Sequence, residues 1–138
     1  MKKLPFSFPI LPVVCVVLVV IAAACGSSNS PNPGAPDTGA PGPIGATMTI
    51  GANGVLSPKD VTITRGQSVS IVNNHNTVHD MTSDPHPNHT DCPAINAVGM
   101  LQPGQSKLTN ALSTARTCGL HDHSRETDTN LQGRITIQ

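Results

Sequence analysis

Histidine and cysteine carry the most evident chemistry in this 138-residue chain. All six histidines lie in its second half, at His75, His79, His86, His89, His121 and His123. Two of the four cysteines, Cys92 and Cys118, lie among them. Imidazole and thiolate are ligands that suit copper or zinc, whereas magnesium and calcium prefer oxygen. The second half of the chain therefore predicts a metal site.

The elements that must position these residues are predicted to be strands. Residues 61–64, 68–71 and 133–138 alternate apolar and polar side chains, and turn-forming residues separate them. This alternation indicates strands with one buried face, and no stretch carries the apolar period of a helix. We predict an all-β fold, a Greek-key antiparallel β-sandwich or barrel. Its aliphatic core is expected to contain Val55, Leu56, Val61, Ile63, Val69, Ile71, Leu108, Leu112, Ile135 and Ile137.

The first 25 residues are predicted to be an export signal. Lys2 and Lys3 precede an apolar run over 10–24, which is short for a membrane span of about 20 residues but suits a signal sequence. The small residues before Cys25 resemble the lipobox of bacterial lipoproteins. This resemblance implies that Cys25 is lipidated and that the protein is anchored to a membrane in the periplasm or at the cell surface. A plain secretory signal that is cleaved nearby is the alternative.

Composition divides the remainder into a linker and one domain. Residues 26–46 are mostly Gly, Ser, Pro, Ala and Asn, so we predict a disordered tether there and a folded domain over 47–138. Eight basic and eight acidic residues give a net charge of zero, which provides no basic field to attract nucleic acid. The length leaves room for a single core. Multidomain enzymes and DNA-binding proteins are excluded.

Two segments resemble a cupredoxin, the type 1 blue copper domain of plastocyanin- and azurin-like proteins. The segment VTITRGQSVSIVNNHNTVHDM is similar to the first half of that domain, and TCGLHDH followed by LQGRITIQ is similar to its C-terminal half. The resemblance implies a cupredoxin-like sandwich that binds one copper ion. It implies that His79, Cys118 and His121 are ligands, with His123 as a candidate fourth ligand.

The resemblance is incomplete around the implied copper site. Leu131 stands where plastocyanin-like members have an axial methionine two residues before the glycine of the last strand. Either the copper stays close to trigonal or His123 completes its coordination. Asp80 or Asn74 is expected to hold a ligand imidazole by a hydrogen bond.

The two cysteines of the domain allow further interpretations. His86-x-x-His89-x-x-Cys92 is a possible second metal cluster, or a loop of solvated histidines. Alternatively, Cys92 and Cys118 pair, since two thiols in an exported domain usually do. That disulfide would close a loop of about 25 residues, contribute about 3 kcal/mol and remove Cys118 as a ligand.

Three functions remain open. A membrane-tethered monomer that passes one electron between transient redox partner proteins best matches the resemblance. A lipoprotein that captures or sequesters copper makes more use of the extra histidines. A metal-free, disulfide-stapled interaction module is the third. An enzyme is not expected, because the sequence shows no catalytic serine or carboxylate-pair arrangement.

Overall fold

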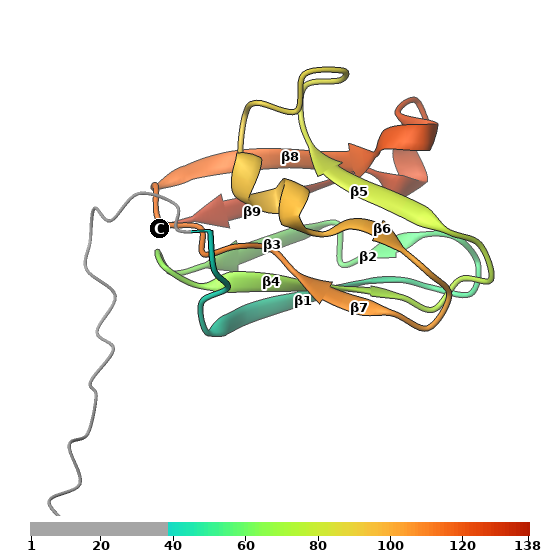
Figure 1. The fold of residues 1–138 in the computed structure, drawn as a ribbon, viewed down its shortest axis with the longest axis horizontal. Helices are drawn as coiled ribbons and strands as arrows, with labels where there is room; N and C mark the ends of the chain where they lie inside the picture. Colours follow the sequence, from blue (N-terminus) through green and yellow to red (C-terminus); the bar gives the residue numbers. More distant parts are fainter. Residues whose placement is uncertain (1–38) are drawn as a thin grey trace, which may run out of the picture.

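The computed structural model describes residues 39–138, which form two β-sheets packed face to face (Figure 1). The first sheet has the strand order β2 (Leu56–Ser57), β1 (Ile44–Ile50), β4 (Ser68–Asn73) and β7 (Ser106–Leu108). The second has the order β3 (Asp60–Ile63), β9 (Gly133–Ile137), β8 (Arg116–Asp122), β5 (His79–Ser83) and β6 (Gly99–Leu101). Three short 3-10 helices complete the fold, at η1 (Pro93–Ala97), η2 (His123–Arg125) and η3 (Thr129–Leu131).

The predicted export signal and most of the predicted tether lie outside the described residues. Among residues 39–138, no helix is both long and apolar enough to cross a membrane.

The predicted all-β sandwich is confirmed, but its sheets are mixed rather than antiparallel. The three alternating segments correspond to β3, β4 and β9. β1 pairs with β4 in parallel, and β3 pairs with β9 in parallel, while β8 runs antiparallel to both of its neighbours. The parallel pair in the first sheet arises because the chain crosses to the other sheet as β3 before it returns as β4.

The core between the sheets is aliphatic, as expected, although its composition differs in detail. Val55, Val61 and Leu108 are only partly buried, whereas the other seven expected core residues are buried. Met48 and Met81 are fully buried. Because the chain has no Phe, Tyr or Trp beyond position 8, flexible thioether side chains help to fill this core.

The folded domain begins earlier than the sequence predicts. The expected end of the tether, residue 46, falls inside β1, where Gly45 lies against Gln67. A Cβ at Gly45 would lie 2.4 Å from Gln67 Oε1, and a Cβ at Gly42 would lie 2.0 Å from the carbonyl oxygen of Gly66. Gly42 therefore allows a close approach of two backbones and Gly45 makes room for the Gln67 side chain, so neither glycine marks a flexible linker.

A disulfide joins Cys92, just before η1, to Cys118 in β8. Both residues are almost completely buried. The bond fixes the end of the β5–η1 loop, which stands above β5 and β8 in Figure 1, against the second sheet. This outcome was one of the alternatives that the sequence left open.

We expect the double substitution Cys92→Ala/Cys118→Ala to lower the free energy of unfolding by about 3 kcal/mol, since the bond closes a loop with a sequence separation of 26 residues. Urea denaturation followed by circular dichroism measures the change. A thiol titration of the unfolded wild-type chain should find no free Cys92 or Cys118. An unchanged unfolding midpoint would contradict the stabilising role.

Candidate metal centre

His79, a ligand implied by the cupredoxin resemblance, is held by a buried carboxylate. Its side chain is 1% exposed, and its Nδ1 lies 2.7 Å from Oδ2 of the fully buried Asp122. Because a carboxylate accepts hydrogen bonds, Nδ1 is the donor. Arg125 Nη1 donates to the same oxygen at 2.9 Å. The partner that orients His79 is therefore Asp122, and not Asp80 or Asn74 as expected.

The second nitrogen of His79 also has a partner. Its Nε2 lies 2.9 Å from His75 Nδ1, and Thr77 Oγ1 lies 2.9 Å from the same His75 atom. Both nitrogens of His79 are thus engaged within the protein. The arrangement is a closed hydrogen-bond network that connects β5 with the end of β8.

The structure does not bring the implied ligands His79, Cys118 and His121 together, because the second sheet places these residues apart. Asp122 pairs with Met81, two residues from His79 on β5, and its side chain reaches His79, whereas Cys118 lies four residues further along β8, about 13 Å. Cys118 and His121 are three residues apart on one strand, so their side chains point to opposite faces. In addition, the Cys118 sulfur is bonded to Cys92.

The residues around His79 therefore do not fit a type 1 copper ion. The site offers no thiolate, and Leu131, at the position of the axial methionine, is an apolar side chain buried in the core. Copper with imidazole and thiolate ligands cannot be assembled there.

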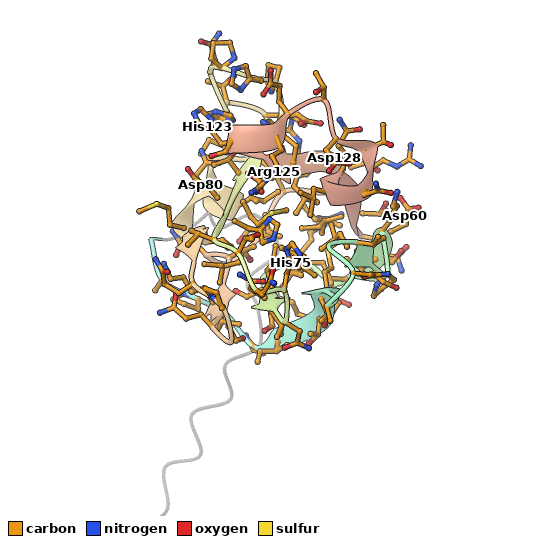
Figure 2. The ribbon with its side chains drawn as sticks, turned by 90° about the vertical axis from the view of Figure 1, so that its right-hand side faces the viewer. Asp60, His75, Asp80, His123, Arg125 and Asp128 are labelled. Carbon is orange, nitrogen blue, oxygen red and sulfur yellow. A yellow bond between two sulfur atoms is a disulfide. The ribbon has the colours of Figure 1, made fainter. Side chains whose placement is uncertain are left out.

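A second group of histidines brings metal-binding atoms together. His86, His89 and His123 each offer a nitrogen, and these three atoms all lie within 4.8 Å of one another. His89 Nε2 is 2.8 Å from His123 Nδ1, and the rings of His86 and His123 have centroids 5.0 Å apart. Two of these residues come from the β5–η1 loop and one from the start of η2. Figure 2 shows His123 beneath that loop and well separated from His75.

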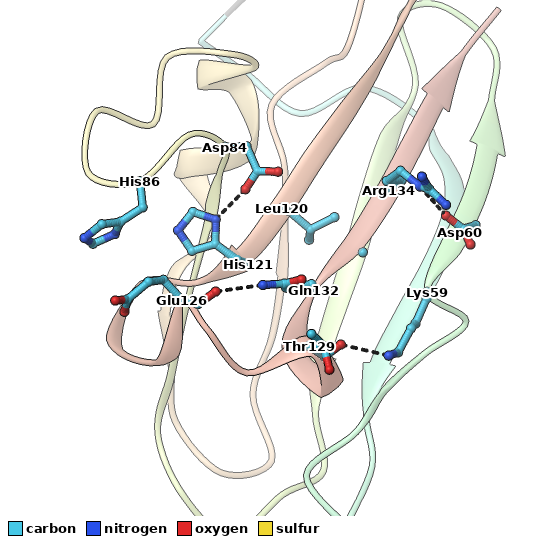
Figure 3. Close-up of a pocket in the computed structure, with 11 residues that line it drawn as sticks. Lys59, Asp60, Asp84, His86, Leu120, His121, Glu126, Thr129, Gln132 and Arg134 are labelled. Atoms are coloured by element: carbon cyan, nitrogen blue, oxygen red, sulfur yellow. Dashed lines mark hydrogen bonds and ion pairs between the residues drawn. The ribbon is translucent and has the colours of Figure 1, made fainter.

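His121 in β8 borders the same group. Its ring centroid lies 5.2 Å from that of His89 and 5.9 Å from that of His86. Its Nδ1 is 2.6 Å from Asp84 Oδ1, a contact drawn in Figure 3. Four imidazoles from three segments therefore meet on the outer face of the second sheet.

The loop backbone holds His89 in a defined orientation. His89 has a φ of 51°, in the left-handed region that few non-glycine residues adopt. Its carbonyl oxygen accepts hydrogen bonds from Asn96 Nδ2 at 2.9 Å and Ser83 Oγ at 3.0 Å. Its Nδ1 donates to the Ser83 carbonyl at 2.7 Å. This leaves the lone pair on Nε2, the nitrogen that faces His123.

The sequence identified these histidines but grouped them differently. It combined His86 and His89 with Cys92, and it combined His121 and His123 with the other implied ligands. The structure brings the four histidines together and commits Cys92 to the disulfide. The mirrored spacings His89-x-x-Cys92 and Cys118-x-x-His121 were a usable signal, because a bond between the two cysteines brings the two histidines close.

A cavity of about 540 Å³ opens beside the histidines. His86 and His121 form part of its wall, opposite Lys59 and an ion pair between Arg134 and Asp60 (Figure 3). Two of the four imidazoles therefore border this cavity.

Known structures share this fold at low sequence identity. No family model and no curated protein matches the sequence. The oxidized plastocyanin of the fern Dryopteris crassirhizoma matches with 19% identity and a TM-score of 0.52 over 67% of this chain and 99% of its own. A purple cupredoxin from Nitrosopumilus maritimus matches with 16% identity, a TM-score of 0.52 and the same coverage. A mutant of amicyanin in its Cu(I) form matches with 14% identity and a TM-score of 0.53 over 68% of this chain and 82% of its own.

These matches define the class of the protein: the chain has a cupredoxin-like fold. Its cluster of imidazoles differs from the ligand set implied by the cupredoxin resemblance. His86 and His89 are not in that set, and His123 was only a candidate fourth ligand. Nitrogen ligands without sulfur suit Cu(II), Zn(II) or Ni(II).

We expect Asp122→Asn to lower the free energy of unfolding by about 1–3 kcal/mol, because it weakens a buried, charge-assisted bond to His79. Asp80→Asn, on the same strand as His79, is the matched control and should change stability by less than about 0.5 kcal/mol. Urea denaturation of both variants compares the two carboxylates. A larger loss for Asp80→Asn would mean that Asp80 is the partner of His79 after all.

Proposed function

We propose that this protein binds one copper ion on His86, His89 and His123, and that it captures or sequesters the metal. The observation that carries the proposal is the convergence of three imidazole nitrogens within 4.8 Å. Copper stands at the top of the affinity order of divalent first-row metals for such nitrogen ligands. The disulfide and the hydrogen bonds of His89 support the proposal, because ligands that are held in place lose little freedom when the metal binds.

One-electron transfer is the second candidate function, and the cupredoxin-like fold favours it. A rigid sandwich limits how far ligands rearrange when a metal changes its oxidation state. However, a centre without thiolate or thioether lacks the soft ligands that favour Cu(I). We therefore rank copper capture first, with electron exchange through transient redox partners at the membrane as the alternative. We propose no catalytic activity.

We also propose that the chain acts outside the cytoplasm, in the periplasm or at the cell surface, as a lipid-anchored monomer. The apolar run before Cys25 and the Pro- and Gly-rich residues after it support an anchor followed by a spacer. A spacer of this composition would let the domain reach a metal donor or acceptor near the membrane surface. The cavity beside His86 and His121 would be the path of the metal.

Copper titration of the full chain, with a competing chelator, tests the metal site. We expect one Cu(II) per chain and no intense thiolate-to-copper absorption band, since Cys118 is bonded to Cys92. His89→Gln and His123→Gln should each weaken binding by more than about 100-fold, the upper end of the cost of losing a ligand's outer partner. His75→Gln is the matched control, because His75 belongs to the network around His79 and should leave the affinity unchanged.

Two results would overturn the assignment of the ligands. An intense absorption band that disappears in Cys118→Ala would return the copper to a thiolate site. Loss of binding in His75→Gln, with binding retained in His89→Gln, would move the copper to the His79 network.

Membrane fractionation of cells that express the full chain tests the proposed anchor. We expect the protein in the membrane fraction and labelled by radioactive fatty acid, because several acyl chains anchor a protein durably. Cys25→Ala should abolish the label. Cys15→Ala is the control and should leave the label unchanged, because Cys15 lies within the apolar run. An unlabelled, membrane-free wild-type protein would favour a plain secretory signal.

A further inference from the structure

We propose that His121 is a fourth ligand of this metal, held in place by Asp84, and that the four imidazoles select Cu(II) over Cu(I). This inference rests on the proposed copper-binding function and adds the coordination number and the oxidation state of the metal that is captured. The observation that carries it is a buried nitrogen without a partner.

His121 Nε2 is buried and forms no hydrogen bond among the described residues. The other ring nitrogen, Nδ1, donates to Asp84 Oδ1 at 2.6 Å. Since the Asp84 carboxylate accepts the proton of Nδ1, the corresponding tautomer of the imidazole has an unused lone pair on Nε2. Buried polar atoms nearly always have a partner, so an exception requires an explanation. A metal ion supplies the missing partner.

The position of His121 fits this role. Its ring lies 5.2 Å from the ring of His89, centroid to centroid, which is close to the 4.8 Å between His89 and His123. His89 is oriented in the same way as His121, because its Nδ1 donates a hydrogen bond to an oxygen, the Ser83 carbonyl. Metal-binding histidines typically donate one ring nitrogen to a carboxylate or carbonyl and ligate through the other. Two adjacent imidazoles thus show this pattern without a metal.

Gly119 makes room for the carboxylate that orients His121. A Cβ at Gly119 would lie 1.9 Å from Asp84 Oδ2, so any larger residue would displace the Asp84 side chain. The Asp84 backbone is bound as well, because its nitrogen donates to the Gly119 carbonyl at 3.1 Å and its oxygen accepts from Asp91 at 2.8 Å. Asp84 is therefore a positioning residue that acts through His121.

The ligand chemistry selects the oxidation state. Thiolate and thioether ligands favour Cu(I), whereas the candidate ligand group consists of imidazoles and both cysteines of the domain form the disulfide. Four imidazole nitrogens favour Cu(II) in a tetragonal arrangement. Zn(II) accepts the same ligands but ranks below Cu(II) in affinity. We therefore expect the chain to retain Cu(II) in the presence of equimolar Zn(II).

The experiment counts imidazoles on Cu(II) bound to the full chain, by X-ray absorption and by the nitrogen couplings in pulsed electron paramagnetic resonance. We expect four in the wild type and three in His121→Gln. The reduction potential of the bound copper should rise in His121→Gln, because a ligand that favours Cu(II) is lost. His75→Gln is the control and should match the wild type in both measurements.

Asp84 is tested by a pair of variants. Asp84→Ala should weaken Cu(II) binding by about 10–100-fold and alter the paramagnetic spectrum. Asp84→Asn keeps an acceptor for His121 Nδ1 and should restore most of the wild-type affinity and spectrum. A purely structural role for Asp84 would lower stability in both variants and leave the spectrum of the bound copper unchanged.

The outcomes separate the two proposals. Three imidazoles in the wild type, or identical copper spectra for the wild type and His121→Gln, would overturn this inference and leave the three-histidine site intact. Retention of Zn(II) in preference to Cu(II) would overturn the metal selectivity. Failure of the wild type to bind copper would overturn both proposals. If His121→Gln does not fold, the imidazole count of the wild type decides by itself.

Discussion

The Cys92–Cys118 disulfide is the constraint on which the candidate site depends. It connects a long loop to the middle of β8, at a point three residues from His89 on one side and three residues from His121 on the other. An ion pair between Arg116 and Asp91 fastens the same loop end to the same strand. A loop without such ties would have to lose conformational freedom before its histidines could share one ion. The covalent bond has already removed that freedom.

Two histidine–carboxylate pairs link β5 and the residue after it to β8, with opposite consequences. His79 bonds Asp122, and both nitrogens of His79 have partners there. His121 bonds Asp84, which directly follows β5, and the other nitrogen of His121 has no hydrogen-bond partner among the described residues. In the first pair, every ring nitrogen of the histidine is satisfied by hydrogen bonds within the protein. The second leaves a lone pair beside other imidazoles and a cavity, which is the arrangement expected of a ligand.

The candidate metal site of this chain does not lie where the cupredoxin resemblance implied copper. The sandwich is similar as a whole to solved structures of a plastocyanin and an amicyanin mutant. At His79, where the resemblance implied copper, the neighbouring group is the carboxylate of Asp122, and the Cys118 sulfur is in the disulfide. The candidate metal-binding nitrogens instead lie on the outer face of the second sheet, under the β5–η1 loop. A shared fold therefore carries no guarantee of a shared site.

The sequence by itself determined the strands and the kinds of ligand. Alternation over 61–64, 68–71 and 133–138 depends only on neighbouring residues, so it predicted β3, β4 and β9, and six histidines near two cysteines indicated metal chemistry. It did not determine the parallel pairing of β1 with β4 or the start of the domain, which depend on segments distant in the chain. Only the tertiary structure decided which histidines meet. The pairing of β5 with β8 sets both the level and the face of each side chain, and a shift of one residue would exchange the faces of His121 and Asp122.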